Sequence, residues 1–316
     1  APLWAGVAGV LGGLVLALRL PWSLRLGGVP LLLPVLFWQA PSIPAGEFDV
    51  LAADVGQGNA VLVRTAQHAL LYDAGPMYSR ESDAGNRVLV PLLRALGVRL
   101  DTLLLSHRDS DHTGGAVAIL KMQPQMSLLS SIEVDHALQT LRPVTRCLAG
   151  QRWQWDGVDF ELLHPQASDY DNVRKPNALS CTLRISNGAQ TVLLAGDIEQ
   201  AQEAQLVLQG QIGVAKSGQP LVGLHADVLL VPHHGSKTSS SDAFLAAVQP
   251  RFAIVQAGYR NRFGHPASPV LVRYDVHGIG VFDTPHCGAA SWQSWAPDQV
   301  QCARKLQQRY WHHAVP

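Results

Sequence analysis

The stretch that decides the fold of this chain is Ser106-His107-Arg108-Asp109-Ser110-Asp111-His112-Thr113-Gly114-Gly115. It follows an apolar strand predicted over 100–105 and leads into a helix predicted over 114–122. The stretch holds two imidazoles and two carboxylates, and buried carboxylates without partners are costly. Neutral imidazoles and carboxylates are ligands of zinc, manganese and iron, so the stretch predicts a metal site. A polar turn capped by its aspartates is the alternative.

The spacing within this stretch indicates how two ions would be held. His107 and Asp109 lie two residues apart and are expected to converge on one ion, while Asp111 and His112 turn toward a second ion. Asp197 directly follows another apolar strand, predicted over 191–195, and is well placed to bridge both ions.

A pair of neighbouring histidines follows the strand predicted over 228–231, in Pro232-His233-His234-Gly235-Ser236. In an extended chain neighbouring side chains point to opposite sides, so one of the two is expected to be a ligand. We favour His234 as the ligand and His233 as a substrate or outer contact, and the reverse assignment stays open. Ser236 and Lys237 add donors that suit phosphate oxygens.

His265 stands in Phe263-Gly264-His265-Pro266, where three roles are open to it: metal ligand, general acid or structural loop residue. The remaining isolated histidines are interpreted as structural, namely His68, His136, His164, His225, His277 and His286.

The rest of the chain beyond residue 46 alternates short apolar strands with helices, which predicts a layered α/β sandwich. Apolar residues make up 47% of the 316 residues, which excludes a disordered chain. Lys plus Arg and Asp plus Glu both number 24, which argues against a strongly basic nucleic-acid binder and leaves room for a local basic groove. Further strands are expected at 49–53, 60–64, 69–72, 160–163, 179–185, 252–255 and 280–282, and further helices at 88–96, 198–208 and 241–248.

The first 46 residues contain no acid and two apolar runs, 2–18 and 27–38, with Arg19 and Arg25 between them. A membrane helix needs about 20 apolar residues, and Gly and Pro are common in such helices. We therefore expect 1–46 to be the end of a membrane region plus linker, in a fragment of a longer membrane protein; a signal-like segment and a buried core segment are the alternatives. Cationic connections tend to stay in the cytoplasm, so the part after Gly46 would lie outside it.

The four cysteines, Cys147, Cys181, Cys287 and Cys302, include no Cys-x-x-Cys pair, which argues against structural zinc. In an oxidising compartment the pairing 147–181 and 287–302 closes the shortest loops. Four ordinary buried thiols are the equally weighted alternative.

Taken in order, the motifs resemble the metallo-β-lactamase fold and, more narrowly, the C-terminal domain of the ComEC competence proteins, inner-membrane channels for transforming DNA. The resemblance covers 47–290 and leaves 291–316 as a C-terminal tail. It is carried by Asp54-Val55-Gly56-Gln57-Gly58, Tyr72-Asp73-Ala74-Gly75, the 107–115 run, Gly196-Asp197-Ile198-Glu199, the 232–236 run and Asn261-Arg262-Phe263-Gly264-His265-Pro266.

The resemblance implies an αββα sandwich with its site at the strand ends, and a metal-dependent nuclease that degrades the DNA strand not taken up. It also implies single-stranded DNA and other competence proteins as partners, an inner-membrane location and a domain facing the periplasm. The chain departs from the broader fold in two ways. Asp109 replaces the second histidine of the usual His-x-His-x-Asp-His loop. The single histidine that usually stands between that loop and the bridging aspartate has no counterpart, and the segment 176–180, where it would be expected, contains none. The resulting oxygen-rich set of His107, Asp109 and Asp197 shifts the metal preference from zinc toward manganese.

We therefore expect phosphodiester hydrolysis by two divalent ions, manganese or zinc, held by His107, Asp109, Asp111, His112, Asp197 and His234. The expected catalytic residues are Asp111 and the proton donors His233 and His265. Phosphate contacts are expected from Asn177, Ser180, Ser236 and Lys237, with a basic edge of Arg251, Arg260 and Arg262.

Two other functions remain open: a two-metal hydrolase of small phosphodiesters or phosphocholine esters, and a non-catalytic DNA-handling module with one structural ion or none. A preference for DNA over a small diester would distinguish the nuclease from the small-substrate hydrolase. The metal content of the purified protein would distinguish the non-catalytic module from either enzyme.

Overall fold

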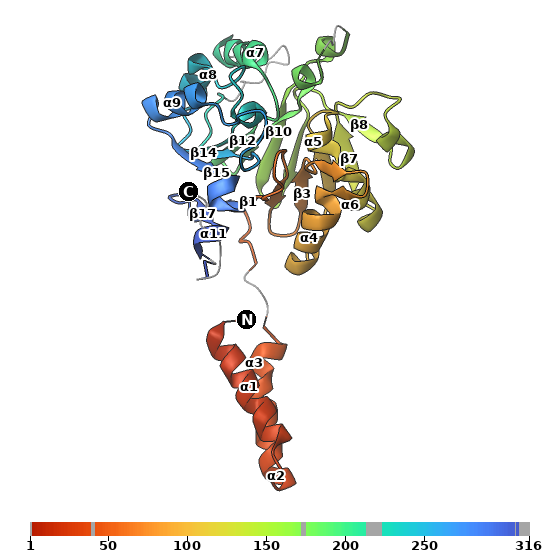
Figure 1. Cartoon of the computed structure of the whole chain (residues 1–316), viewed down its shortest axis with the longest axis vertical. Helices are drawn as coiled ribbons and strands as arrows, with labels where there is room; N and C mark the ends of the chain where they lie inside the picture. The colour runs from red at the N-terminus through yellow and green to blue at the C-terminus, as the bar shows by residue number, and fades with distance from the viewer. Residues whose placement is uncertain (1, 39–41, 172–174, 213–222, 307, 310–316) are drawn as a thin grey trace. The chain divides into compact units, whose positions relative to one another are not determined.

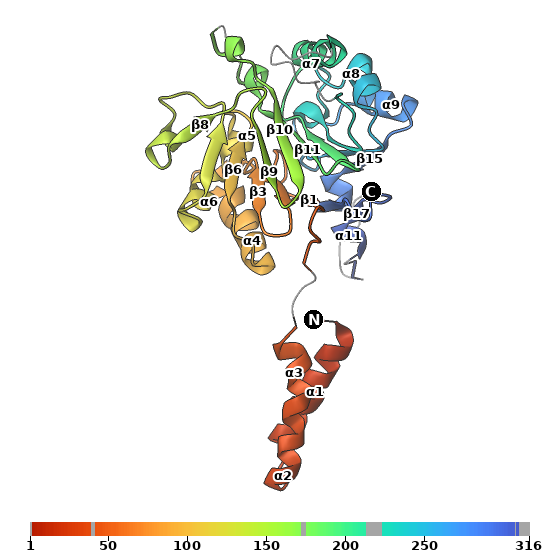
Figure 2. The ribbon, with the colours of Figure 1, turned by 180° about the vertical axis from the view of Figure 1, so that it is seen from behind.

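The computed structural model describes residues 2–38, 42–171, 175–212, 223–306 and 308–309. The chain divides into two compact units, 1–42 and 43–316. The polypeptide of each unit can be followed in Figure 1, and the opposite side of each in Figure 2.

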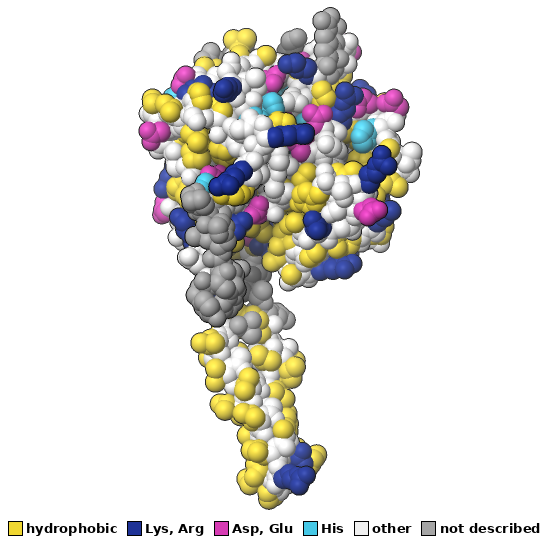
Figure 3. All heavy atoms as spheres, viewed as in Figure 1, with side chains coloured by type: hydrophobic (Ala, Val, Ile, Leu, Met, Phe, Trp, Pro, Cys, Tyr) yellow, Lys and Arg dark blue, Asp and Glu magenta, His cyan; other side chains and the backbone are white. Residues whose placement is uncertain are grey.

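The first unit is a helical hairpin of α1 (Leu3–Ala17) and α3 (Val29–Leu36), connected through α2 (Trp22–Arg25) and a turn of 3-10 helix at Leu26–Gly28. Gly12 and Gly28 let the two helices approach closely, since a Cβ on either would come within 2.6 Å of the other residue's carbonyl oxygen. Hydrophobic side chains cover most of its surface, and cations gather at one end (Figure 3). None of the helices in the described ranges combines the length and the hydropathy that crossing a membrane requires, so the expected membrane segment is not confirmed.

The second unit contains two large sheets. The first has eight strands in the order β17-β16-β1-β2-β3-β6-β7-β8, and the second has seven in the order β15-β14-β13-β12-β11-β10-β9. Strands of the first sheet are β1 (Asp49–Ala52), β2 (Val61–Arg64), β3 (Ala69–Tyr72), β6 (Thr102–Leu105), β7 (Ser127–Ser130), β8 (Val144–Arg146), β16 (Ala290–Gln293) and β17 (Gln301–Cys302). Those of the second are β9 (Arg152–Trp155), β10 (Val158–His164), β11 (Thr182–Ser186), β12 (Thr191–Leu194), β13 (Val228–Leu230), β14 (Phe252–Val255) and β15 (Gly280–Asp283).

Helices cover the outer faces of both sheets (Figures 1 and 2). The first sheet packs against α4 (Val90–Leu96) and α6 (Ala116–Met122), and the second against α7 (Gln200–Ile212), α8 (Asp242–Val248) and α9 (Ser268–Val276). Strand β3 shows why both faces must be covered: Leu70 and Tyr72 enter the core between the sheets, while Ala69 and Leu71 enter the core under the helices. The predicted αββα sandwich is confirmed.

Several strands were absent from the sequence interpretation, and one boundary needs correction. The predicted tail 291–316 begins inside β16, which pairs with β1 in antiparallel register, Val50 opposite Trp292. Trp292 is fully buried in the core between the sheets, so this segment completes the first sheet. The burial of Trp292 reflects core packing, which a short run of polar and aromatic residues does not reveal.

Both predicted disulfides are confirmed, and each joins one sheet to the other. Cys147 follows edge strand β8 and bonds to Cys181, which precedes β11. Cys302 lies on the opposite edge strand, β17, and bonds to Cys287 just after β15. The two bridges therefore fasten the sandwich near both of its edges.

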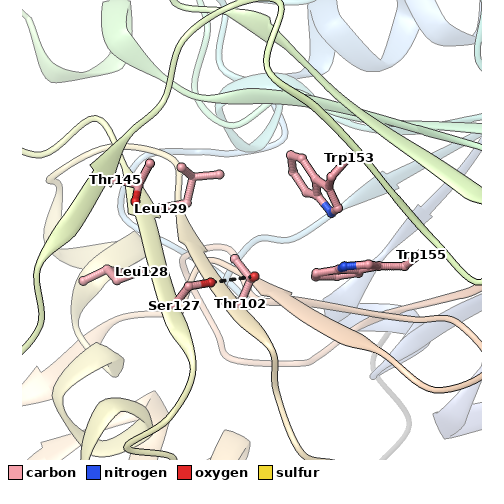
Figure 4. A pocket seen from close by; sticks show the side chains of 7 residues that line it. All are labelled: Thr102, Ser127, Leu128, Leu129, Thr145, Trp153 and Trp155. Atoms are coloured by element: carbon pink, nitrogen blue, oxygen red, sulfur yellow. Dashed lines mark hydrogen bonds between the residues drawn. The ribbon is translucent and has the colours of Figure 1, made fainter.

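A cavity of about 260 Å³ opens near the beginnings of β6 and β7 (Figure 4). Trp153 and Trp155 of β9 line one side, and the hydroxyls of Thr102 and Ser127, 2.8 Å apart, bond to each other on the other side. Its remaining lining residues are Leu128, Leu129 and Thr145.

Candidate metal centre

The polar residues singled out in the sequence follow the ends of strands in both sheets. His107 comes two residues after β6, and Asp111 and His112 lie on the one-turn helix α5 (Ser110–Thr113). Asp197 follows β12, and His234 lies in the 3-10 turn Pro232–Gly235 after β13. Because these strands are neighbours or face each other across the sandwich, their ends bring together side chains from distant parts of the sequence.

Two overlapping groups of potential ligands result. The first is His107, His112 and Asp197, and the second is Asp111, His112 and His234; within each group the potential ligand atoms lie within 4.8 Å of one another. The Nε2 atom of His112 lies 3.3 Å from Asp197 Oδ1, and that of His234 lies 3.3 Å from Asp111 Oδ2 and 3.6 Å from Asp197 Oδ2. Asp197 thus stands beside both groups, as expected of a bridging carboxylate.

The inward-facing atoms of this cluster fit divalent cations. The Nε2 atoms of His107, His112 and His234 and the Oδ1 atom of Asp197 are all buried and lack a hydrogen-bond partner. Four buried polar atoms left unpaired within one cluster would be costly, and a bound cation satisfies them together. Nitrogen and carboxylate oxygen donors suit zinc, manganese or iron.

The other ring nitrogen of each of these histidines is held by the protein. His112 Nδ1 lies 2.8 Å from Asp73 Oδ2, and His234 Nδ1 lies 2.8 Å from the carbonyl oxygen of Gln256. His107 Nδ1 lies 3.0 Å from the hydroxyl of Ser106. An acceptor on Nδ1 fixes the tautomer in which Nε2 carries the free lone pair, which is the arrangement that metal sites use.

Within the cluster the imidazoles and carboxylates lie close enough to shift one another's pKa values. Burial opposes the charged forms, but the imidazoles of His112 and His234 outweigh it and hold the pKa of Asp197 well below its usual range. In the same way, Asp197 and Asp73 overcome burial and raise the pKa of His112 well above its usual value. Protons on these imidazoles occupy the place of a cation, so metal binding would release them.

The distinction between His233 and His234 has a different cause from the one expected. The backbone is not extended here: both residues have positive φ, 50° and 54°, in a tight turn. His234 joins the second group, whereas His233 lies outside both groups, with Nε2 3.8 Å from Asp197 Oδ2 and 3.3 Å from Asn177 Nδ2. The assumption of alternating sides was wrong, and the turn itself aims the two rings in different directions.

Asp109 lies at the edge of the cluster. Its Oδ2 atom lies 3.5 Å from His107 Nε2, so the two side chains converge as expected. The Asp109 side chain is 42% exposed, and it belongs to neither of the two groups. His112, which the sequence assigned to the second ion alone, belongs to both groups. The reason is the helix α5, which turns His112 inward and leaves Asp109 at its N-terminal edge.

The four expected phosphate contacts lie in different environments. Ser180 is fully buried, and its hydroxyl accepts a hydrogen bond from the Asp197 N–H at 3.0 Å, so it positions a ligand and is not available to substrate. Ser236 is nearly buried, with its hydroxyl 3.1 Å from that of Thr238. Lys237 is exposed, and the amide of Asn177 is half-buried beside His233.

His265 lies at the margin of the centre. Its ring centroid is 5.7 Å from that of His233 and 6.4 Å from that of His234, and it belongs to neither ligand group. Burial, together with these two neighbouring imidazoles, lowers the pKa of His265 to about 4. At neutral pH it is therefore an uncharged imidazole beside the cluster.

Three supporting residues were given no role in the sequence interpretation, although Asp73 stands in one of the motifs that carry the resemblance. Asp73 and Gln256 hold ligand histidines, and each directly follows an apolar strand, the same signal that singled out His107. Asn59 is buried with both side-chain polar atoms unpaired, and its N–H donates to the carbonyl of Asp111. Nothing in the local sequence of Asn59 indicates this position.

Comparison with known proteins agrees with this geometry. Residues 53–259 match the metallo-beta-lactamase superfamily. Competence protein ComA of Neisseria gonorrhoeae is 39% identical over 290 residues, which cover 92% of this chain and 38% of that protein. Recombination protein 2 of Haemophilus influenzae is 35% identical (83% and 30% covered), and ComE operon protein 3 of Bacillus subtilis is 30% identical (84% and 35% covered).

The chain spans about a third of the length of these relatives. Among solved structures, the CmlA beta-hydroxylase E377D mutant superposes with a TM-score of 0.50 at 15% identity, covering 90% of this chain and 62% of that one, which is a likeness of fold alone. The chain therefore belongs to the metallo-beta-lactamase superfamily, as a domain of the ComEC family of competence proteins.

Proposed function

We propose that this chain is a metal-dependent phosphodiesterase, specifically a deoxyribonuclease that degrades the DNA strand not transported during natural transformation. The observation that carries the proposal is the set of buried, unpaired histidine Nε2 atoms facing Asp111 and Asp197. The names of the relatives support a role in competence.

The chain's own residues have distinct parts in this proposal. His107, His112 and Asp197 would hold one manganese or zinc ion, with Asp109 as an added oxygen ligand, and Asp111, His112 and His234 would hold a second. Bound ions would lower the pKa of a water molecule and stabilise charge on the phosphate oxygens.

Residues around the ligands would bind the phosphodiester. Burial lowers the pKa of His233, as it does that of His265, so both are uncharged at neutral pH and would donate a hydrogen bond to the departing sugar oxygen, which would take its proton from solvent water. The Asn177 amide and the exposed Lys237 ammonium would hold the phosphate.

We also propose that the domain works on the periplasmic side of the inner membrane, attached through the unit 1–42, beside other competence proteins of a ComEC-like channel. Two disulfides support an oxidising compartment, because such bonds persist outside the cytosol. The hydrophobic surface of the hairpin α1–α3 supports membrane association.

A non-catalytic DNA-handling module is the second candidate, favoured by the exposure of Asp109, which leaves the first group with one firm ligand fewer than expected. A two-metal hydrolase of small phosphodiesters would use the same ligands.

The deciding experiment is a cleavage assay on end-labelled single-stranded DNA with manganese, zinc or chelator, combined with metal analysis. Cleavage that requires manganese or zinc and about two equivalents of metal support the nuclease. Absence of cleavage by metal-loaded protein overturns it. Turnover of a chromogenic diester in preference to DNA favours the small-substrate hydrolase.

A further inference from the structure

An exposed loop at 258–265 combines aromatic and cationic side chains beside the metal centre. Tyr259 and Phe263 are 46% and 53% exposed, although burial of such rings is normally favourable. The guanidinium of Arg260 lies 5.1 Å from the ring centre of Tyr259, and that of Arg262 lies 4.8 Å from that of Phe263. Two exposed aromatic–arginine pairs thus lie within five residues.

The backbone of this loop is held in one conformation by a single side chain. Asn261 accepts hydrogen bonds from the N–H groups of Phe263 (3.1 Å) and His265 (3.0 Å), and its amide donates to the carbonyls of Gly258 and His265. Because the loop is already ordered, binding a ligand to its rings would cost little additional conformational entropy.

The loop is continuous with the metal centre. The ring of Phe263 stacks on that of His265, with centroids 5.7 Å apart and planes 23° apart, and His265 in turn neighbours His233 and His234. A base stacked on Phe263 would therefore lie next to the candidate ligands.

A third aromatic–arginine pair lies nearby, with Tyr78 on the hairpin of β4 (Met77–Ser79) and β5 (Ser82–Asp83) and Arg87 in the helical turn Gly85–Leu89 that follows. Tyr78 is 42% exposed, its hydroxyl donates to the carbonyl of Val55, and the guanidinium of Arg87 lies 5.8 Å from its ring centre.

The turn 56–58 lies between the hairpin and the loop. Gly56 faces the Tyr78 ring, and the side chain of Gln57 accepts a hydrogen bond from the Gly258 N–H. A Cβ on Gly58 would come within 2.2 Å of the Asp111 carbonyl oxygen. The two aromatic surfaces are thus joined through a turn that packs against the metal centre.

We propose that these residues form a strand-binding rim, defined as Tyr78, Arg87, Tyr259, Arg260, Arg262 and Phe263, which stacks unpaired bases of single-stranded nucleic acid and holds its phosphates beside the metal centre. Exposed aromatic rings interleaved with cations are the chemistry that binds single strands, since every base offers a face for stacking. The chain contains no Asp or Glu between Asp242 and Asp275, so the loop 258–265 is the more cationic side. The hairpin β4–β5 carries Glu81 and Asp83 and is therefore less cationic than the loop. A duplex, whose bases are already stacked, would gain only the phosphate contacts.

This inference deepens the proposed function, on which it rests for its substrate class, but binding is measurable without cleavage. The test is fluorescence anisotropy of a labelled thymidine 20-mer and of a duplex of equal length, with the 316-residue chain in mild detergent and chelator. We expect tighter binding of the single strand. Replacing Tyr259 and Phe263 by Ala should weaken single-strand binding by about 5- to 150-fold per ring, since stacking contributes about 1–3 kcal/mol per base.

Conservative variants separate stacking from mere loss of fold. The double variant Tyr259→Phe and Phe263→Tyr should restore binding, because both rings keep their faces. The variants Arg260→Gln and Arg262→Gln should each reduce the slope of log affinity against log salt by about 0.7. Trp295→Ala removes another exposed aromatic side chain, outside the rim, and should leave binding unchanged.

Equal binding of single strand and duplex, or equal losses for both in the alanine variant, overturns the inference. The inference is also overturned if the wild-type protein cleaves DNA but the alanine variant binds single strands as tightly as wild type. In that case the nuclease proposal would be retained and the strand-binding rim rejected. Binding that depends on the rim in a protein without cleavage would support the inference and contradict the nuclease.

Discussion

Strand β6 has two very different ends. At its beginning Thr102 lines the cavity, where its hydroxyl pairs with that of Ser127 opposite two indole rings. Just beyond its end, His107 enters a cluster whose buried nitrogens face carboxylates and find no hydrogen-bond partner. Only four residues of strand separate an apolar cavity from a polar cluster that could hold a cation.

This contrast indicates that the residues that stabilise the sandwich differ from those that form the metal centre. Between the two ends, Leu104 of β6 packs into the hydrophobic core between the sheets, and either end could in principle hold a site. What distinguishes the metal end is the accumulation of polar groups after successive strands, each supported from behind by Asp73, Ser106, Ser180 or Gln256. Variants at the two ends should therefore separate activity from stability.

The largest effect is expected at the metal end. Replacing Asp111 by Ala should reduce metal-dependent DNA cleavage by more than about 100-fold, beyond the loss typical of outer-sphere changes, and lower the bound metal content. The Asp111 side chain is partly exposed, so the variant should still fold in chelator, but the midpoint of thermal unfolding should fall because the pairing with His234 and His112, which lowers the Asp111 pKa, is lost. Retained cleavage at the wild-type rate would show that the second group is not catalytic.

A smaller effect, on metal affinity, is expected from a residue that holds a ligand histidine without being a ligand itself. Asp73 accepts hydrogen bonds from His112 Nδ1 and from the Ser106 N–H and hydroxyl, so Asp73→Asn places an amide donor against at least one of these donors. The resulting change of His112 tautomer should weaken metal affinity by about 10- to 100-fold, measured by competition with a chromogenic chelator. Thr102→Val at the cavity end is the matched control and should leave metal affinity unaltered.

At the cavity end of β6, substitutions should lower the stability of the fold and leave metal affinity nearly unchanged. Trp153 stacks on Phe160 with ring centroids 5.2 Å apart, and Trp153→Ala enlarges the existing cavity. We expect a loss of about 2–4 kcal/mol in the free energy of unfolding by urea, with metal affinity within twofold of wild type. Trp153→Phe keeps one aromatic ring against Phe160 and removes the rest of the indole, including an N–H that has no partner, so it should cost less than Trp153→Ala. A large drop in metal affinity for Trp153→Ala would mean that the two ends are coupled.

The smallest effect concerns Asp156, which follows β9, and its contribution to the pH dependence of the free energy of unfolding. Burial alone would raise the pKa of Asp156, but hydrogen bonds from the Thr65 hydroxyl and the Gln67 N–H outweigh it and lower the pKa below the ordinary value of 3.8. A lowered carboxyl pKa stabilises the folded state above the unfolded value, and this contribution disappears as pH falls through the folded value.

Asp156→Asn should therefore reduce the free energy of unfolding by at most about 1 kcal/mol near pH 7, with the difference vanishing in acid below pH 3.8. Asparagine tolerates the positive φ of 52° at this position, so the backbone should not change. Paired urea titrations across pH 2–7 measure this, and a difference that grows in acid would contradict the assignment.

Much of the fold could be predicted because its strands are strongly apolar. The strand ending before His107 and the ones before Asp197 and His233 lie where the sequence placed them, because runs of three or more apolar residues between polar ones fit a strand buried on both faces. Strands β7, β8 and β9 mix polar residues with apolar ones near a sheet edge, so they escaped notice. Strand β16 pairs with β1 across more than two hundred residues, a register that no local pattern encodes.

By itself, the sequence determined that imidazoles and carboxylates follow the ends of apolar strands, which already indicates a metal-binding sandwich. The tertiary structure decided which of them meet: His112 joins both groups, Asp109 stays at the edge, and Ser180 turns inward to hold Asp197. The physical reason is that residue type is local, whereas the direction of a side chain depends on a helical turn, a positive φ or a hydrogen bond from a strand far away in the chain.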